Sequence, residues 1–278
     1  MKIKSIFLLP LTLGLTARNK EESLSQDGLP VNAVHITATV GNPFATTHTN
    51  PVGTAEEQAK FNSGDKILVT KFNNNNRENV VYQFNGSKWA PTENKHLLWM
   101  NDKETFHAYY PVGEDGILNE EIYYDQSTLE KITMSDLMSA NIYKTSKGQV
   151  LNFVMERQTM RIVIKIVKFN PEFSGDNKVS DVKILCNIRV LNPYQQGDGG
   201  VNSTYTVLSQ ASLVANCVSL KVGDKELRSA NFLDNMNYGK SYTYNLTVGK
   251  EKLEIGSVTV ADWTGKVDLD GGNVSERL

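Results

Sequence analysis

The chain has 278 residues, of which 40% are hydrophobic, and a formal net charge of −2 at neutral pH. This length and composition allow a substantial core and favour two domains of ordinary size over one large domain. The pI is near 6.1 and the Lys and Arg residues are scattered, so nucleic acid is not a predicted partner. After residue 17, no apolar run approaches the roughly 18 residues that span a bilayer.

The N-terminal residues have the layout of an export signal. Two lysines precede an apolar run over residues 6–15 and two small residues, which predicts a signal peptide over 1–17 and an exported protein. The polar residues 18–30 follow as a predicted tether. A bacterial lipoprotein would carry its lipidated cysteine at the first tether position, where this sequence has Arg18.

Three explanations of Arg18 remain open. Arg18 stands in place of a cysteine, or an ordinary signal peptidase cuts after Ala17, or the true start of the protein lies elsewhere. We favour the first explanation, because the surrounding signal is otherwise complete. Position 18 is then the predicted site of lipid attachment.

The first segment after the tether predicts a β-strand. Apolar and polar residues alternate over residues 34–40, which gives one apolar and one polar face. The apolar positions are Val34, Ile36, Ala38 and Val40. The same period of two recurs at 67–69, 80–84 and 106–110, and Asn85–Gly86 predicts a tight hairpin turn.

A single stretch looks helical, over Ser135–Tyr143, with Ser135 as its cap. The polar segment Lys144–Gln149 then predicts a domain boundary, which divides the chain into domains over 31–147 and 148–278.

Alternation with a period of two returns in the second half of the chain. Its apolar positions are Met160, Ile162, Ile164 and Ile166, then Val182, Ile184, Cys186, Ile188 and Val190, and finally Tyr242, Tyr244, Leu246 and Val248. Because no repeated helix is present to join parallel strands, the pattern predicts an all-β protein with few short helices. The predicted architecture is two antiparallel β-sandwich domains.

The sequence gives little indication of catalysis. The four histidines, at positions 35, 48, 96 and 107, lack the close spacing of a metal site, and no catalytic residue, metal ligand or cofactor is predicted. Cys186 and Cys217 lie in apolar strand-like segments, which favours buried thiols over a disulfide. Six aromatic residues are candidates for stacking on sugar rings, although core packing is the commoner role. They are Trp89, Trp99, Tyr109, Tyr110, Tyr123 and Tyr124.

The order of the segments resembles the fimbrillin family of Gram-negative pilins and pilin-associated surface lipoproteins. The similar segments are VNAVHITATVGN, FNSGDKILV, VYQFNGSKW, TFHAYYPV, ITMSDLMSA, VLNFVMERQTMRIVIKI and YTYNLTVGKEKLEIGSVTVADW. Together they cover about Val31 to Trp263, and AYYP at Ala108–Pro111 is the most telling of them.

The resemblance implies a non-enzymatic fimbrial (pilus) subunit that supports cell adhesion. It further implies two sandwich domains related to the transthyretin architecture, export as a lipoprotein precursor, and a position at the outer membrane surface or in the fimbria. The partners would be other pilin subunits, bound by strand exchange, and host or bacterial surface ligands. The exchangeable strand would be Val34–Val40, and a lipid anchor would require a cysteine at position 18.

One departure bears on the role within a fimbria. Shaft subunits of the family are often cleaved after an arginine near the first strand, but no arginine lies between Arg18 and Arg77. We therefore favour an accessory, tip or anchor subunit. The alternative is a surface lipoprotein that binds glycan or peptide without polymerising.

Overall fold

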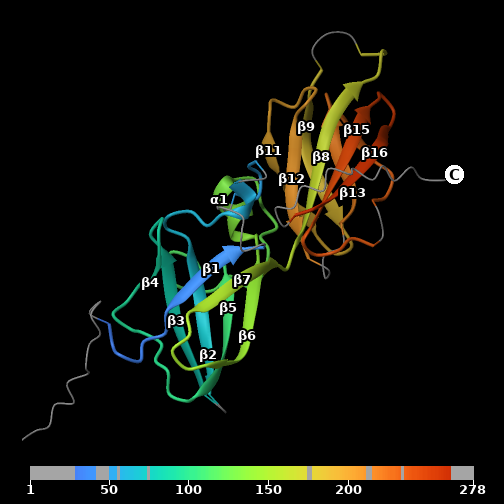
Figure 1. The fold of residues 1–278 in the computed structure, drawn as a ribbon. Coiled ribbons are helices and arrows are strands. Elements are labelled where there is room, and N and C mark those ends of the chain that lie inside the picture. The colour runs from blue at the N-terminus through green and yellow to red at the C-terminus, as the bar shows by residue number, and fades with distance from the viewer. Residues whose placement is uncertain are drawn as a thin grey trace, which may run out of the picture.

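The computed structural model describes residues 29–41, 50–54, 57–73, 76–173, 177–210, 215–232 and 235–263. The chain forms two β-rich lobes in sequence order (Figure 1). The first lobe contains β1 to β7, and the second contains β8 to β16. Between the lobes lies a short helix, α1 (Leu129–Met134).

The first lobe is built on one seven-stranded sheet in the order β1-β7-β6-β5-β2-β3-β4. Its strands are β1 (Ile36–Val40), β2 (Lys66–Asn73), β3 (Asn76–Phe84), β4 (Trp89–Pro91), β5 (Lys103–Tyr110), β6 (Met138–Ser146) and β7 (Leu151–Arg157). A 3-10 turn at Glu57–Ala59 precedes β2. Strands from both ends of this sheet, including β1 and β3, share one apolar core, so the sheet curls around that core.

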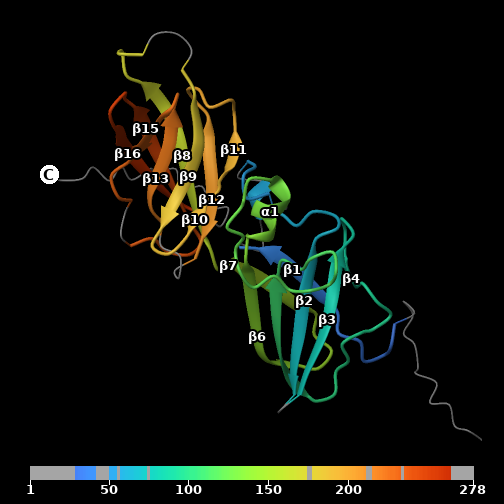
Figure 2. The same cartoon turned by 180° about the vertical axis from the view of Figure 1, so that it is seen from behind.

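The second lobe is a sandwich of two sheets, seen from behind in Figure 2. The four-stranded sheet has the order β10-β9-β13-β14, with β9 (Val179–Cys186), β10 (Val190–Leu191), β13 (Ala215–Val222) and β14 (Lys225–Arg228). The five-stranded sheet has the order β11-β12-β8-β15-β16, with β8 (Met160–Phe169), β11 (Tyr194–Gln196), β12 (Thr204–Ser209), β15 (Lys240–Val248) and β16 (Leu253–Asp262). Inward residues of both sheets form a single apolar core.

The predicted all-β class and most of the predicted alternation are confirmed. Every apolar position predicted for β8 and β15 is buried, because a period of two places alternate side chains on the same face of a strand. Gly86 adopts a φ of +93° in the hairpin between β3 and β4, as the Asn-Gly pair predicts. The pattern fails beyond Cys186, where β9 ends and Ile188 is 67% exposed.

Two strand pairs correct the expectation of purely antiparallel sheets. β1 runs parallel to β7, and β8 runs parallel to β15. Parallel neighbours need a long connection, and here that connection is supplied by the intervening strands of each lobe rather than by a helix.

The predicted helix over Ser135–Tyr143 is wrong. The helix lies earlier, where the Thr128 hydroxyl accepts a hydrogen bond from the Lys131 amide and caps α1. Ser135 is its C-terminal cap, and the rest of the predicted helix mostly belongs to β6. The buried Met138 and Ala140 alternate there with more exposed residues, and pairing with β5 outweighs the helical tendency of this short segment.

The strand β7 bears on the division into domains. The predicted boundary would assign it to the second domain, but it pairs with β1 and β6 in the first sheet. Met155 belongs to the core of the first lobe and Met160 to that of the second. We propose that the domains meet at Gln158–Thr159.

Candidate assembly site and the junction between the lobes

The strand β1 lies at one end of the first sheet. It forms a ladder with β7 alone, from the pair Ile36 and Leu151 to the pair Val40 and Met155. A strand in this position can leave by breaking one ladder. The residues before β1 also pair with Leu97–Trp99: the Val34 amide donates to the Leu97 carbonyl and the Trp99 amide to the Asn32 carbonyl, both at 2.8 Å. The Asn32 side chain donates to the Trp99 carbonyl at 3.2 Å, and Ala33 forms a bridge with Leu98.

The two faces of this segment differ as the alternation predicts. Val34, Ile36 and Val40 are at most 7% exposed and pack in the first core, and Ala38 packs against that core. On the outer face, the Thr37 hydroxyl donates to the Asn152 side-chain oxygen at 2.6 Å. Without β1, the lobe would have an apolar slot beside the unpaired backbone of β7.

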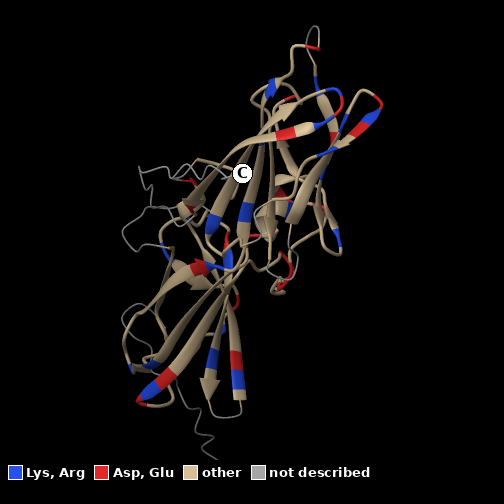
Figure 3. Cartoon of the chain, turned by 90° about the vertical axis from the view of Figure 1, so that its right-hand side faces the viewer, with Lys and Arg blue, Asp and Glu red and all other residues tan. Residues whose placement is uncertain are grey.

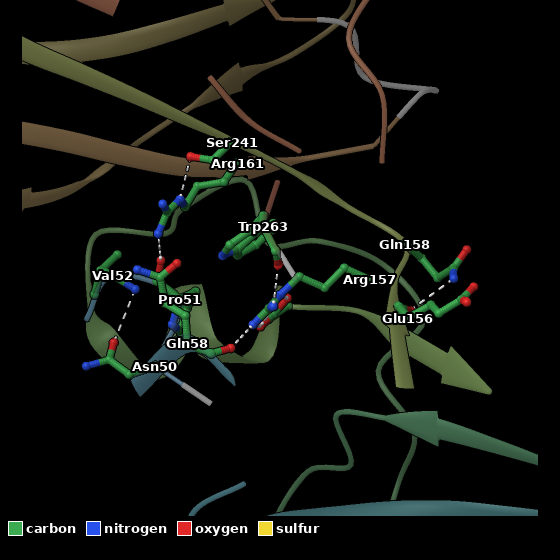
Figure 4. Close-up of polar contacts among 11 residues, drawn as sticks. Asn50, Pro51, Val52, Gln58, Glu156, Arg157, Gln158, Arg161, Ser241 and Trp263 are labelled. Atoms are coloured by element: carbon green, nitrogen blue, oxygen red, sulfur yellow. Dashed lines mark hydrogen bonds and ion pairs between the residues drawn. The ribbon is translucent and has the colours of Figure 1, made fainter. Parts of the chain in front are cut away.

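The segment Asn50–Thr54, which follows β1 after residues outside the description, is held by the second lobe. The Arg161 guanidinium donates to the Pro51 carbonyl at 3.0 Å (Figure 4), and the Gln196 side chain donates to the Val52 carbonyl at 3.3 Å. None of these contacts involves β1. The chain that follows β1 is therefore held by contacts that do not depend on β1.

Arg157, at the end of β7, is the centre of the junction between the lobes. Its side chain is almost fully buried and forms a two-pronged ion pair with the buried Asp136, with nitrogen to oxygen distances of 2.9 to 3.2 Å. It also donates to the Trp263 carbonyl at 2.7 Å and to the Gln58 carbonyl at 2.5 Å. One side chain thus connects β7, the segment before β2 and the end of β16 (Figure 4).

The Trp263 ring completes this junction. The Arg157 guanidinium lies 4.2 Å from the ring centroid and that of Arg161 lies 5.4 Å from it, which is the geometry of cation–π contacts. The ring also packs with Ile132 of α1 and Leu208 of β12. Trp263, Ile132 and Leu208 thus form one apolar cluster between the lobes.

Burial changes the ionisation of the junction. It raises the pKa of Asp136 above its ordinary value, although Arg157 opposes the change. Burial, with a contribution from the Arg157 charge, lowers the pKa of Arg161 to about 10, so this guanidinium is still charged at neutral pH. These groups hold one another in place and present no free reactive atom to a substrate.

The predicted site residues fall into two groups. The four residues of the predicted strand come together on the inner side of β1, whereas Arg18 and His48 lie outside the described residues. Sequence reasoning missed the junction, because no spacing pattern links Asp136, Arg157 and Trp263.

Other sequence predictions concern metals, thiols and membranes. Within the described ranges, no three His, Cys, Asp or Glu side chains gather in a way that would hold a metal ion. Cys186 and Cys217 are unpaired thiols, and burial raises the pKa of Cys186 to about 11. No helix in the described part of the chain is long and apolar enough to cross a membrane. In the view of Figure 3, acidic and basic residues are interspersed over both lobes.

Comparison with known proteins identifies the family. The sequence matches the fimbrillin-like family over residues 52–263, which is most of the chain and includes the junction and both lobes apart from β1. The chain belongs to the fimbrillin-like family. The family resemblance seen in the sequence is therefore confirmed, and it supports the role of a fimbrial subunit, a structural rather than enzymatic protein exported to the cell surface.

Solved structures share the fold of this fimbrillin-like chain. A candidate cell adhesion protein from Bacteroides uniformis aligns with a TM-score of 0.55 and 16% identity, over 84% of this chain and 100% of its own. A candidate cell adhesion protein from Bacteroides ovatus aligns with a TM-score of 0.57 and 16% identity, over 83% of this chain and 97% of its own. At this identity the likeness concerns the fold. No curated protein matches the sequence.

Proposed function

We propose that this fimbrillin-like chain assembles into fimbriae by exchanging β1 for a strand of a neighbouring subunit. The observation that carries the proposal is the position of β1, which is an edge strand with a single ladder and an apolar inner face. An incoming strand with the same alternation would satisfy the β7 backbone and fill the apolar slot in one step.

Two details favour the release of β1. The Thr39 hydroxyl is buried without a hydrogen-bond partner among the described residues, and such a group costs about 1–3 kcal/mol. The chain after β1 is anchored at Pro51 and Val52 by the second lobe. After loss of β1, these contacts would therefore still hold the chain before β2 and the junction in place.

We further propose an accessory, tip or anchor role rather than a shaft role. The first arginine after Arg18 is Arg77, which lies inside β3 and pairs with Phe72 of β2. Cleavage after Arg77 would divide a strand that lies between two others. Between Arg18 and Arg77 the sequence therefore offers no arginine after which β1 could be cleaved from the rest of the chain.

A disulfide lock between β1 and β7 tests strand exchange. The partners Thr37 and Asn152 touch through their side chains, and neighbouring strands lie within the range of Cα separations that a disulfide spans. In a background where Cys186 and Cys217 are serine, the Thr37→Cys/Asn152→Cys variant should take up a labelled peptide of the sequence Ala33–Gly41 when reduced and none when oxidised. Fluorescence anisotropy of the labelled peptide measures the effect.

The matched control is a lock within the other parallel pair, Thr243→Cys/Val163→Cys between β15 and β8. Its oxidised form should bind the peptide as well as its reduced form. Equal uptake of the peptide by the oxidised β1 lock would overturn strand exchange through β1. Failure of every variant, and of the parent chain, to bind the peptide would favour the non-polymerising surface binder.

A second prediction concerns position 18. The Arg18→Cys substitution in the full chain should move the protein into the membrane fraction with an acylated N-terminus, because the preceding residues have the layout of an export signal. Several acyl chains anchor a protein stably, since each buried methylene contributes about 0.8 kcal/mol. Incorporation of radiolabelled fatty acid measures the modification, and the unchanged Arg18 chain is the control. An unlabelled Arg18→Cys product would contradict the lipoprotein interpretation.

A further inference from the structure

The outer face of the first sheet presents an ordered array of side chains. Strand registers align the outward residues of β2, β3, β5 and β6 in rows across the sheet. The rows are Arg77, Phe72 and Thr105; then Asn79, Thr70, His107 and Asn141; then Val81, Leu68, Tyr109 and Ser139. Of these residues, Thr70 is buried. Neighbouring positions along a row lie about 5 Å apart, close to the width of a sugar ring.

Aromatic rings form the middle of this array. The ring centroids of Phe72 and His107 are 4.4 Å apart, and His107 also contacts Tyr109 and Tyr143 edge to face. The His107 Nδ1 and the Tyr109 hydroxyl are hydrogen-bonded at 3.2 Å. Tyr143 is 67% exposed. A large ring standing on the outer face of a sheet, next to polar side chains, is suited to stack on the apolar face of a ligand.

At the Arg77 end of this face, the outward charges are positive. The outward positions of the four strands include Arg77 and Lys103, and Lys144 lies beside Thr105, whose hydroxyl accepts from its amide at 3.3 Å. The two glutamates of these strands do not face outward. Glu104 is buried, where it binds the Met100 amide, and Glu78 pairs with the buried Lys71.

The other charges near this face are partly compensated. Lys66, at the opposite end of β2, pairs with Glu114. Burial, assisted by the Arg77 charge, lowers the pKa of His107 below its ordinary value, so the imidazole is neutral at pH 7. The uncompensated charge among these strands is therefore cationic and lies at the Arg77 end.

A groove of about 360 Å³ continues the array. Leu68, Val81 and Asn79 line it, and Leu68 is the cross-strand neighbour of Tyr109. Glu93 and Lys95 also line it and carry opposite charges. The groove has the size and the mixture of apolar and polar groups that small-molecule sites have.

We propose that this outer face binds an acidic oligosaccharide, a short chain of pyranose rings that carries a carboxylate. One ring would stack on Tyr143 and its aromatic neighbours, the carboxylate would pair with Arg77, and Lys144 would add positive charge. The hydroxyl groups of successive rings would bind Asn79 and Asn141, because these residues lie three strand spacings apart, about 15 Å. A second copy packed through the same face would bring cation against cation. The charge therefore favours an anionic ligand over self-association.

Binding to defined sugars tests this site on the folded chain. Isothermal titration with sialyllactose and with trigalacturonate, against lactose as the uncharged probe, should show saturable binding of at least one acidic sugar and none of lactose. The Arg77→Gln variant should bind about tenfold more weakly, which is the effect of losing roughly 1.4 kcal/mol from one charge-assisted hydrogen bond. The Tyr143→Ala variant should lose a similar factor. Which acidic sugar binds distinguishes a sialic acid from a uronic acid ligand.

Matched controls lie on the second lobe. Arg228→Gln and Tyr238→Ala remove an exposed arginine and a 45% exposed tyrosine, and both should leave binding unchanged. Equal binding of lactose, equal loss in the controls, or no binding of either acidic sugar would overturn the proposal. Sedimentation of the parent chain as a dimer that Tyr143→Ala dissociates would also overturn it, in favour of a subunit interface. These results are separable from strand exchange, because no variant alters β1.

Discussion

A chain that begins at residue 46, and so lacks β1, should be far less stable than the full chain. The three buried residues Val34, Ile36 and Val40 contribute roughly 1.5–3 kcal/mol each. Their sum is a large part of the roughly 5–15 kcal/mol by which a typical domain is stable. Urea unfolding followed by tryptophan fluorescence measures the loss, and Trp99 reports on the first core directly.

An added peptide should restore this truncated chain. The peptide Ala33–Gly41 has the alternation of β1, and it should bind the vacant slot and raise the free energy of unfolding by about 2.7 kcal/mol at a hundredfold excess over its Kd. The control is the same peptide with Ile36→Asp and Val40→Asp, which cannot enter an apolar slot. A stable truncated monomer that ignores both peptides would refute the exchangeable strand.

Local pattern predicted the strands of this protein because alternation is a local property. Val34–Val40, Met160–Ile166 and Tyr242–Val248 each fold as their period of two requires. The order of strands within a sheet is not local, and this explains why the parallel pairs of β1 with β7 and β8 with β15 were missed. Pairing between strands more than 70 residues apart in the sequence cannot be inferred from the residue pattern of either strand alone.

The misplaced helix has a related cause. Ser135 suits the start of a helix as well as the end of one, and only the Thr128 cap and the packing of Ile132 between the lobes decide for the earlier segment. The strand β1 could be predicted because its residues are contiguous. The junction could not, because Asp136, Arg157 and Trp263 meet only in the folded chain.

The Arg157→Met substitution should destabilise the protein by about 3–5 kcal/mol, the usual cost of leaving one partner of a buried ion pair alone. It removes the ion pair with Asp136 and the hydrogen bonds to the carbonyls of Trp263 and Gln58. The matched control is Lys131→Met, which breaks the half-exposed ion pair with Asp125 and should cost much less, because solvent screens such a pair. Urea unfolding at pH 7 compares the two variants.

The cost of Arg157→Met should also depend on pH in a definite direction. Burial already raises the pKa of Asp136, and without Arg157 nothing comparable opposes it. An acid whose pKa is higher in the folded than in the unfolded chain binds its proton more tightly when folded, so stability falls as pH rises above the unfolded value of about 3.9. The free energy of unfolding of the variant should therefore be closer to that of the parent chain near pH 4 than at pH 7.

The Arg157→Met/Asp136→Leu double variant removes the buried charge and should recover much of the loss of stability at pH 7. A loss that is independent of pH and unrelieved in the double variant would show that the lobes are joined by packing around Trp263 rather than by the ion pair.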